Sequence, residues 1–245
     1  MAARKVVLIT GGGRGIGAAS VALAAKAGWD VVFTYAGNAE RAKTTEAAAR
    51  AHGGEVLAVR ADVGDPAGIA ASFAAVDDRF GRLDGLVNNA GITGPKATLA
   101  DSTDAIWDRV LRVNLIGAAA CCREALKRMG RGGAIVNVSS RASTLGGAGE
   151  WIHYAASKGG MDSLTIGLAK EAGPLGIRVN AISPGLIETE LHAAAGMPDR
   201  VAQMVGGVPL GRGGTAEEVA EAVIWLLSDA ARYVSAAIIP VAGGR

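Results

Sequence analysis

Short apolar runs alternate with helix-like segments along almost the whole chain, and this alternation limits the fold more than any other feature of the sequence. The runs are continuously apolar and rich in β-branched residues, which is typical of strands in a sheet covered on both faces. They predict strands at residues 5–10, 30–35, 55–60, 85–88, 134–139, 177–183 and 236–241. Strands that alternate with helices predict a parallel sheet with helices on both sides.

The segments between the predicted strands have the length and composition of helices. We predict helices at residues 16–27, 39–51, 66–80, 103–129, 152–171 and 216–228. Because no linker or break in composition divides the sequence, we predict one doubly wound α/β domain over residues 1–245. The longest stretch without clear regularity, residues 185–214, is expected to be a functional loop.

The composition excludes several classes of protein. A formal net charge of +2, with basic residues scattered along the chain, gives no reason to expect binding to nucleic acid or to an anionic membrane. No apolar stretch approaches the ~20 residues of a membrane span, and no targeting segment is visible, so we predict a cytoplasmic protein. Cys121 and Cys122 are neighbours in a predicted helix and are expected to be buried thiols, and the histidines show no metal-ligand spacing.

A glycine-rich turn joins the first predicted strand to the first predicted helix. The strand ends at Thr10, and Gly11-Gly12-Gly13-Arg14-Gly15-Ile16-Gly17 leads directly into the helix. Glycines allow a sharp turn and the close approach of a phosphate to bare backbone. The start of the helix then offers free N–H groups and the positive end of its dipole. This context predicts a binding site for the pyrophosphate of a dinucleotide.

Four short motifs follow predicted strand ends in a defined order: Thr10-Gly11-x-x-x-Gly15-x-Gly17, Asn88-Asn89-Ala90-Gly91, Tyr154-x-x-x-Lys158 and Pro184-Gly185. In these motifs the chain resembles the short-chain dehydrogenase/reductase family, including its 3-oxoacyl-[acyl-carrier-protein] reductases and glucose-dehydrogenase-like members. The resemblance covers essentially the whole chain. It implies a Rossmann-type fold with a seven-stranded sheet, in which residues 1–110 mainly bind the dinucleotide and residues 111–245 supply catalysis and the substrate loop.

Tyr154 and Lys158 are four residues apart on a predicted helix and therefore share one face. A carbonyl that accepts a hydride must also receive a proton, and a free tyrosine, with a pKa of about 10, exchanges protons poorly near neutrality. A lysine charge about 4 Å away contributes roughly 4 kcal/mol at an effective dielectric near 20. That energy corresponds to a decrease of about three pKa units, so we expect the pKa of Tyr154 near 7. This decrease is the largest to expect, because desolvation of the phenol acts in the opposite direction.

The resemblance also implies roles for individual residues. It makes Tyr154 the general acid–base and gives Lys158 a second role in holding the nicotinamide ribose. It assigns the asparagine of a proton relay to Asn114. The serine that orients the carbonyl is expected to be Ser140, fourteen residues before Tyr154, with Ser143 as the alternative, because the usual gap of thirteen falls on an arginine.

The same resemblance implies the residues that contact the cofactor. They come from the glycine turn, the end of the second strand, the segments that flank the adenine and its ribose, the catalytic helix and the segment after the sixth strand. The expected contacts are Gly11, Arg14, Gly15, Ile16, Gly17, Asn38, Asp62, Val63, Asn88, Ala90, Gly91, Tyr154, Lys158, Pro184, Gly185, Ile187 and Thr189. Asp62 is alternatively a helix cap before Pro66.

The end of the second strand indicates which dinucleotide is preferred. NAD-dependent enzymes of this fold usually place an acidic residue there to bind the ribose 2′-hydroxyl, but residues 34–38 contain no carboxylate. Arg14 lies where NADP-preferring relatives often have a base, and a guanidinium suits a phosphate. We therefore predict a preference for NADP(H), with NAD(H) possible.

The function expected from these features is hydride transfer between NADP(H) and a small carbonyl or alcohol. One alternative is a 3-oxoacyl-[acyl-carrier-protein] reductase, and another, of a different class, is a non-catalytic regulator that senses the dinucleotide. The substrate pocket is expected to be partly apolar and to include Trp151, His153 and Leu191. Small residues on the helix at 152–171 and the apolar end of the chain, together with the family resemblance, predict a homotetramer.

Overall fold

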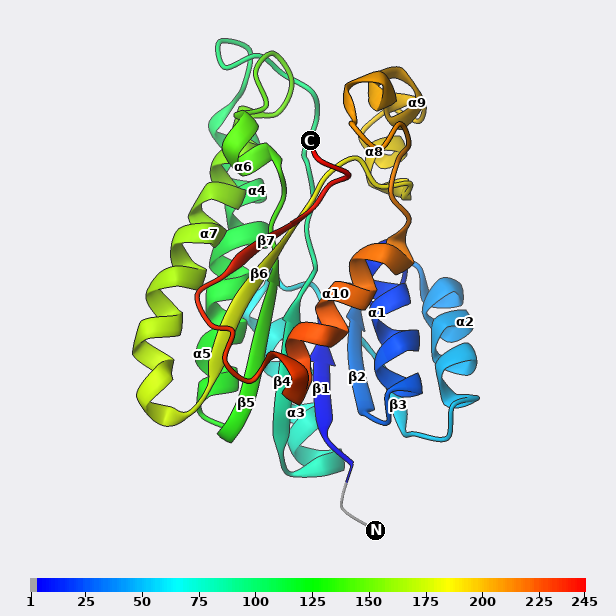
Figure 1. Cartoon of the computed structure of the whole chain (residues 1–245), viewed down its shortest axis with the longest axis vertical. Helices are drawn as coiled ribbons and strands as arrows, with labels where there is room; N and C mark the ends of the chain where they lie inside the picture. Colours follow the sequence, from blue (N-terminus) through cyan, green and yellow to red (C-terminus); the bar gives the residue numbers. More distant parts are fainter. Residues whose placement is uncertain (1–3) are drawn as a thin grey trace.

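One sheet of seven parallel strands, in the order β3-β2-β1-β4-β5-β6-β7, forms the centre of the molecule (Figure 1). This arrangement is seen in a computed structural model, which describes residues 4–245. The strands are β1 (Val6–Ile9), β2 (Asp30–Tyr35), β3 (Val56–Arg60), β4 (Leu83–Asn88), β5 (Met129–Val138), β6 (Arg178–Pro184) and β7 (Ile238–Val241). The predicted Rossmann-type single domain with a seven-stranded parallel sheet is confirmed.

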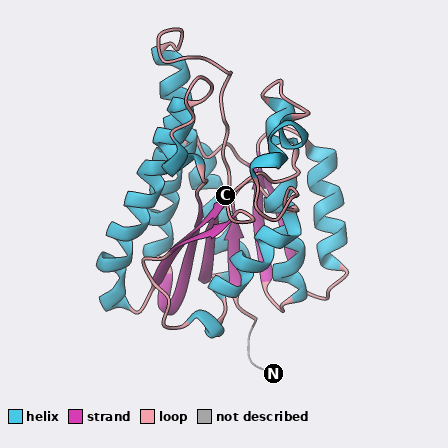
Figure 2. Cartoon of the chain, turned by 45° about the horizontal axis from the view of Figure 1, so that its top comes forward, coloured by secondary structure: helices cyan, strands magenta, loops and turns pink. Residues whose placement is uncertain are grey.

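Helices cover both faces of the sheet (Figure 2). One face packs against α1, α2 and α10 through residues such as Val21, Ala49 and Val223, and the other against α3, α5 and α7 through Phe73 and Leu168. The helices are α1 (Gly15–Lys26), α2 (Ala39–Arg50), α3 (Pro66–Phe80), α4 (Asp104–Leu111), α5 (Ala118–Leu126), α6 (Ala142–Leu145), α7 (Ile152–Ala172), α8 (Glu190–Ala194), α9 (Arg200–Met204) and α10 (Ala216–Leu227). Shorter helical turns are η1 (Arg112–Gly117), η2 (Gly173–Leu175), η3 (Val205–Gly207) and η4 (Asp229–Ala231).

The strand order reverses at β1. The chain proceeds outward from β1 through β2 to β3, then returns to the other side of β1 and proceeds through β4 to β7. Connections after β1 and β4 therefore leave the sheet on opposite faces, which opens a crevice at the carboxyl ends of these strands. All seven strands point toward the same edge, so the segments that follow them gather there, at the top of Figure 1.

Local sequence explains where several helices begin. Asp65 accepts a hydrogen bond from the backbone N–H of Ala67 and caps α3, with Pro66 in the first turn. The helix α10 begins with a capping box between Thr215 and Glu218. The helix cap before Pro66 is thus Asp65, and the alternative interpretation of Asp62 as that cap was wrong.

The predicted helix at residues 103–129 is divided in the structure. It consists of α4, the π-helical turn η1 and α5, which ends at Leu126. Strand β5 then begins at Met129, five residues before the predicted start at 134. Residues 130, 132 and 133 are glycines. The first part of the strand is therefore not an apolar run, and the sequence pattern did not predict it.

The stretch at residues 185–214 also differs from the expectation of an irregular loop. It contains α8, α9 and the 3₁₀ turn η3. Within residues 4–245, no helix is long and apolar enough to cross a membrane, and no group of three side chains could hold a metal ion.

Candidate active site

A cavity of about 500 Å³ opens at the carboxyl edge of the sheet, at the reversal of strand order. Its walls come from the β1–α1 turn, the segment after β4, the β5–α6 connection, the start of α7, the segment after β6, and α8 and α9. These segments are far apart in the sequence, and the sheet brings them together. The position is where ligands bind in open α/β sheets.

The glycine turn forms one wall and is closely packed. Gly11 and Gly15 have φ values of +69° and +52°, in the left-handed region that favours glycine. A Cβ on Gly17 would lie 2.1 Å from the backbone oxygen of Gly11, so this position admits no side chain. The turn is tied to β2, because the Gly11 N–H donates to Thr34 Oγ1 at 3.1 Å. The result is a bare backbone cradle at the N-terminus of α1, where backbone N–H groups can bind an anion.

Ser140, Tyr154 and Lys158 converge on the same cavity. Tyr154 and Lys158 lie one turn apart on α7, and Ser140 follows the end of β5. Lys158 is buried, donates from Nζ to the carbonyl of Val138 at 2.7 Å, and lies 5.7 Å from the centroid of the Tyr154 ring. The structure therefore places a phenol, a hydroxyl and an ammonium around one space.

Asn114 lies in η1 and is completely buried. Its Oδ1 accepts from the Ile92 N–H at 2.9 Å, and its Nδ2 donates to the Ile92 carbonyl at 2.8 Å and to Ser157 Oγ at 3.0 Å. Ser157 in turn donates to the backbone oxygen of Tyr154 at 2.7 Å. This chain of bonds links η1 to the turn of α7 that carries Tyr154 and Lys158, and Ser157 is not among the residues that the sequence indicated.

Residues 11–245 match the family model described as enoyl-(acyl carrier protein) reductase. The chain belongs to the short-chain dehydrogenase/reductase family.

Relatives match this short-chain dehydrogenase/reductase over nearly their full length. The uncharacterized oxidoreductase YgfF of Escherichia coli (strain K12) is 46% identical, over 98% of this chain and 99% of the relative. The cis-4-hydroxycyclohexanecarboxylate dehydrogenase of Sinomonas cyclohexanicum is 43% identical, over 99% and 96% of the two chains. The crystal structure of a short chain dehydrogenase from Burkholderia cenocepacia J2315 in complex with NADP has a TM-score of 0.92 at 34% identity, over 98% and 97% of the two chains.

The protonation of the pair on α7 differs from the sequence-based expectation. Burial raises the pKa of Tyr154, and a hydrogen bond from the Ser140 side chain only partly opposes this increase. Burial also lowers the pKa of Lys158 to about 8, while the charge of Asp162 acts in the opposite direction. The expected pKa of Tyr154 near 7 was therefore wrong for this structure, because burial, and not the lysine charge, sets the direction of the change.

The two asparagines after β4 have different roles in this short-chain dehydrogenase/reductase. Asn88 is buried, and its Nδ2 donates to Asn137 Oδ1 at 2.9 Å, inside the domain. Asn89 lines the cavity, and its Nδ2 donates to the backbone oxygens of Thr10 and Gly11 at 2.9 and 3.0 Å. The side chain of Asn88 is thus directed away from the cavity, and the sequence analysis missed Asn89. The following residues, Ala90 and Gly91, line the cavity as expected.

Besides Asn88, four other expected cofactor contacts are outside the cavity wall. Gly17 packs against the turn, and Asn38 accepts from the Arg41 N–H at the start of α2. Val63 is buried in the core. Asp62 accepts hydrogen bonds from Arg109 at 2.7 Å and from the Gly64 N–H at 2.8 Å. Burial acts to raise the pKa of Asp62, but these two bonds lower it. Arg14, Gly15 and Ile16, in contrast, line the cavity beside Gly11.

The segment after β6 forms the opposite wall, as expected. Pro184, Gly185, Ile187 and Thr189 all line the cavity. A Cβ on Gly185 would lie 2.8 Å from Ala242, so the absence of a side chain allows the chain to pass close to the segment after β7. The Gly185 N–H donates to the Val241 carbonyl at 3.0 Å, which holds the two segments together.

The remaining wall is largely apolar and contains an ion pair. Arg200 in α9 lies 2.6 Å from Glu150 and stacks over the ring of Trp151 at 4.6 Å. His153 is buried behind this wall, with its Nε2 2.9 Å from the Thr93 carbonyl, and does not line the cavity. The expectation that His153 lines the pocket was wrong, because this residue, in the first turn of α7, contacts the Thr93 carbonyl and the Trp107 ring instead. The apolar residues of the wall are Leu145, Trp151, Leu186, Leu191 and Met204.

Proposed function

We propose that this short-chain dehydrogenase/reductase transfers a hydride between NADP(H) and a small carbonyl or alcohol carbon. The observation that supports this best is the convergence of Ser140, Tyr154 and Lys158 on a cavity that continues to the bare backbone at Gly11 and Gly15. One end of the cavity has groups that handle a proton and a carbonyl oxygen. The other end has the N-terminus of a helix, which suits a pyrophosphate.

The residues of the glycine turn fit a dinucleotide. A Cβ on Gly11 would lie 2.9 Å from Ala90 Cα, so this cradle is formed by backbone alone. We assign the pyrophosphate to Gly11, Gly15 and Ile16, and the nicotinamide end to Pro184, Gly185, Ile187 and Thr189. When bound, the nicotinamide supplies or accepts the hydride.

Side chains of the protein then transfer the proton to or from the substrate oxygen. Tyr154 donates a proton to the carbonyl oxygen in reduction and removes it from the alcohol in oxidation. Ser140 binds and orients the same oxygen, and Lys158 stabilises the phenolate and binds the nicotinamide ribose. Asn114 is the positioning residue of this set, because its bonds reach the backbone of Tyr154 through Ser157.

A panel of small carbonyl compounds tests this function. NADPH oxidation is followed with ring ketones, chain ketones, sugars and an acyl thioester; turnover of a ketone supports the proposal. The Sinomonas relative is named for a ring alcohol, so ring ketones are the first compounds to test. Turnover of the thioester alone would favour reduction of carrier-bound acyl groups, which the description of the family model names. Cofactor binding without any turnover would favour a regulator.

The preference for NADP(H) depends on Arg14 and on the absence of an acid after β2. Arg14 is exposed, lines the cavity at the start of α1, and has no ion-pair partner among residues 4–245. Tyr35 ends β2, and no carboxylate follows before α2. A 2′-phosphate at this point would meet a guanidinium and no negative charge. The Burkholderia neighbour is in complex with NADP, which supports the same assignment.

We expect Arg14→Ala to lower kcat/KM for NADPH by about 10- to 150-fold, the value of one charge-assisted contact. The same variant should use NADH almost as well as the wild type, since the 2′-hydroxyl needs no cation. Lys26→Ala, at the other end of α1, is the matched control and should change neither value. Equal kcat/KM for both cofactors in the wild type would contradict the assignment.

We also propose that the protein assembles as a homotetramer through helix α7 and strand β7. Gly159 and Gly167 have open space where a Cβ would be, and Ile116 and Ile166 are exposed. These small and apolar residues allow close approach of another helix. Light scattering at micromolar concentration is expected to give four times the chain mass of 24.6 kDa. We expect Ile166→Glu to lower the measured mass; a monomeric wild type would refute the tetramer.

A further inference from the structure

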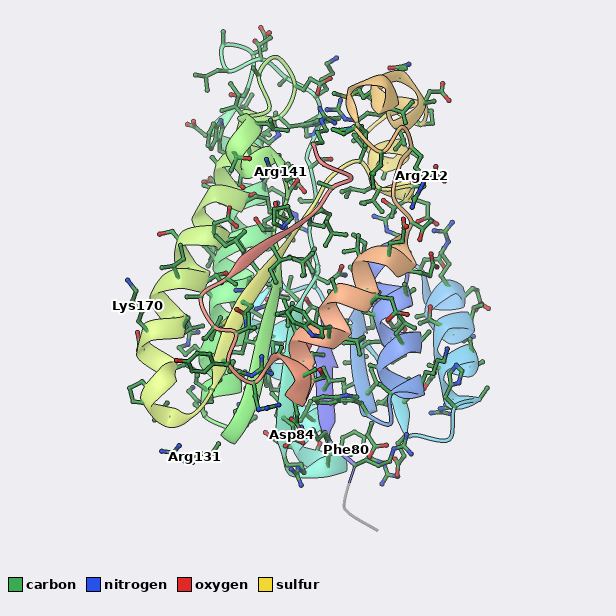
Figure 3. The ribbon with its side chains drawn as sticks, viewed as in Figure 1. Phe80, Asp84, Arg131, Arg141, Lys170 and Arg212 are labelled. Carbon is green, nitrogen blue, oxygen red and sulfur yellow. The ribbon has the colours of Figure 1, made fainter. Side chains whose placement is uncertain are left out.

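The residue that follows Ser140 is an arginine that lines the cavity. The backbone N–H of Arg141 donates to the Pro184 carbonyl at 2.9 Å, which ties it to the end of β6. Figure 3 shows Arg141 near the upper end of the molecule, beside the final segment of the chain. The backbone of Arg141 is therefore fixed at the end of β6, directly after Ser140.

One nitrogen of the Arg141 guanidinium makes a hydrogen bond, and the other two make none. Its Nε donates to the backbone oxygen of Arg245 at 2.8 Å. Among the Asp and Glu side chains of residues 4–245, none forms an ion pair with Arg141, and its two terminal nitrogens make no hydrogen bond. A half-buried guanidinium with its terminal nitrogens unpaired can accept a planar anion end-on through both of them.

The negative side chains of the cavity do not compensate this charge. Glu150 pairs with Arg200 at 2.6 Å, and Glu190 pairs with Arg41 at 2.7 Å. Both carboxylates of the wall are thus neutralised by their own partners. Arg141, beside Ser140, therefore has no acidic side chain of the cavity wall as its partner.

The rest of the wall suits a carbon skeleton. Leu145 comes from α6, Leu186 follows β6, and Leu191 and Met204 come from the segment at 185–214. Apolar walls with a few placed polar or charged groups are typical of a site that binds an apolar body and orients it by those groups.

We propose that the substrate is an apolar ring or chain alcohol, or its ketone, with a carboxylate that Arg141 binds through its two terminal nitrogens. This inference rests on the proposed function, because Ser140 and Tyr154 hold the reacting oxygen while Arg141 holds the carboxylate. The reacting carbon and the carboxylate belong to one molecule but bind to different side chains, so the carbon skeleton must separate them.

The first experiment measures binding and needs no turnover. The dissociation constants of cyclohexanecarboxylate and its neutral isostere cyclohexanecarboxamide are measured by calorimetry on the NADP-loaded protein. We expect the carboxylate to bind about 10- to 150-fold more tightly. Arg141→Gln should abolish the difference, and Arg141→Lys should retain part of it. Arg131→Gln, at the opposite end of the sheet (Figure 3), removes the same charge and should leave the difference intact.

The second experiment compares kcat/KM for 4-oxocyclohexanecarboxylate and its methyl ester with NADPH. The wild type should prefer the acid by a similar factor, mainly through KM, and Arg141→Gln should lose that preference. An equal loss for acid and ester would show that Arg141 merely anchors the end of the chain and would overturn the inference. Equal binding of the acid and the amide by the wild type would overturn it as well. Binding of the acid without turnover of either ketone would instead contradict the proposed function and leave the carboxylate site supported.

Discussion

Tyr154→Phe is expected to lower kcat by about 10²- to 10⁴-fold, the range for loss of a general acid–base. The substitution keeps the ring, which packs near Lys158 at 5.7 Å, and removes the hydroxyl that lines the cavity. Because burial raises the pKa of Tyr154, the phenol is protonated at neutral pH and is ready to donate in the direction of reduction. The measurement is steady-state NADPH oxidation with the ketone that gives the highest wild-type rate.

The controls separate chemistry from binding. NADPH binding, followed by its fluorescence, should be nearly unchanged in Tyr154→Phe, since the ring and Lys158 remain. Tyr233→Phe removes a hydroxyl from a fully exposed tyrosine and should keep the wild-type rate. A kcat of Tyr154→Phe close to that of the wild type would refute the role of Tyr154 as the proton donor.

Ser140→Ala is expected to lower kcat by about 10²- to 10³-fold, the range for removal of one donor at a developing oxyanion. Ser140 lines the cavity and donates a hydrogen bond that lowers the pKa of Tyr154. Its removal should therefore raise that pKa further. Alcohol oxidation needs the deprotonated phenol, so its pH–rate profile should shift to higher pH in the variant.

Ser143→Ala is the matched control and distinguishes the two candidate serines. Ser143 is not part of the cavity wall, and its Oγ is buried without a hydrogen-bond partner in the described structure. Replacing such a hydroxyl by hydrogen removes an unsatisfied polar group, so we expect activity within about twofold and no loss of stability. A large loss of activity in Ser143→Ala, with a normal Ser140→Ala, would reverse the assignment.

The fold was predictable because the strands of this buried parallel sheet contain short apolar runs rich in β-branched residues. Val6–Ile9, for example, is buried at every position. The glycine turn was predictable because Gly11 and Gly15 need a backbone conformation that other residues rarely adopt. The motif residues that meet in the cavity follow from strand order, which places segments after β1, β4, β5 and β6 at one edge.

Other features depended on information that a single sequence does not contain. The π-helical turn around Asn114 has no sequence pattern of its own, so the predicted helix continued through it. The two adjacent asparagines Asn88 and Asn89 look equivalent until the pleat of β4 directs one inward. The direction of the pKa of Tyr154 depends on how deeply the ring is buried, because burial raises this pKa more than the Ser140 hydrogen bond lowers it. The cytoplasmic location, the tetramer and the division of labour between residues 1–110 and 111–245 stay predictions.

The residues of the cavity wall come from segments that are widely separated in the sequence, from Gly11 to Arg245. During synthesis on a ribosome, the glycine turn emerges long before Ala242, which packs against Gly185. A nascent chain therefore has no complete catalytic space until β7 has joined the edge of the sheet beside β6. Contacts between distant segments also form slowly during folding. Recovery of enzymatic turnover after dilution from denaturant would thus report the final step of folding, and it should lag behind the recovery of helical circular dichroism.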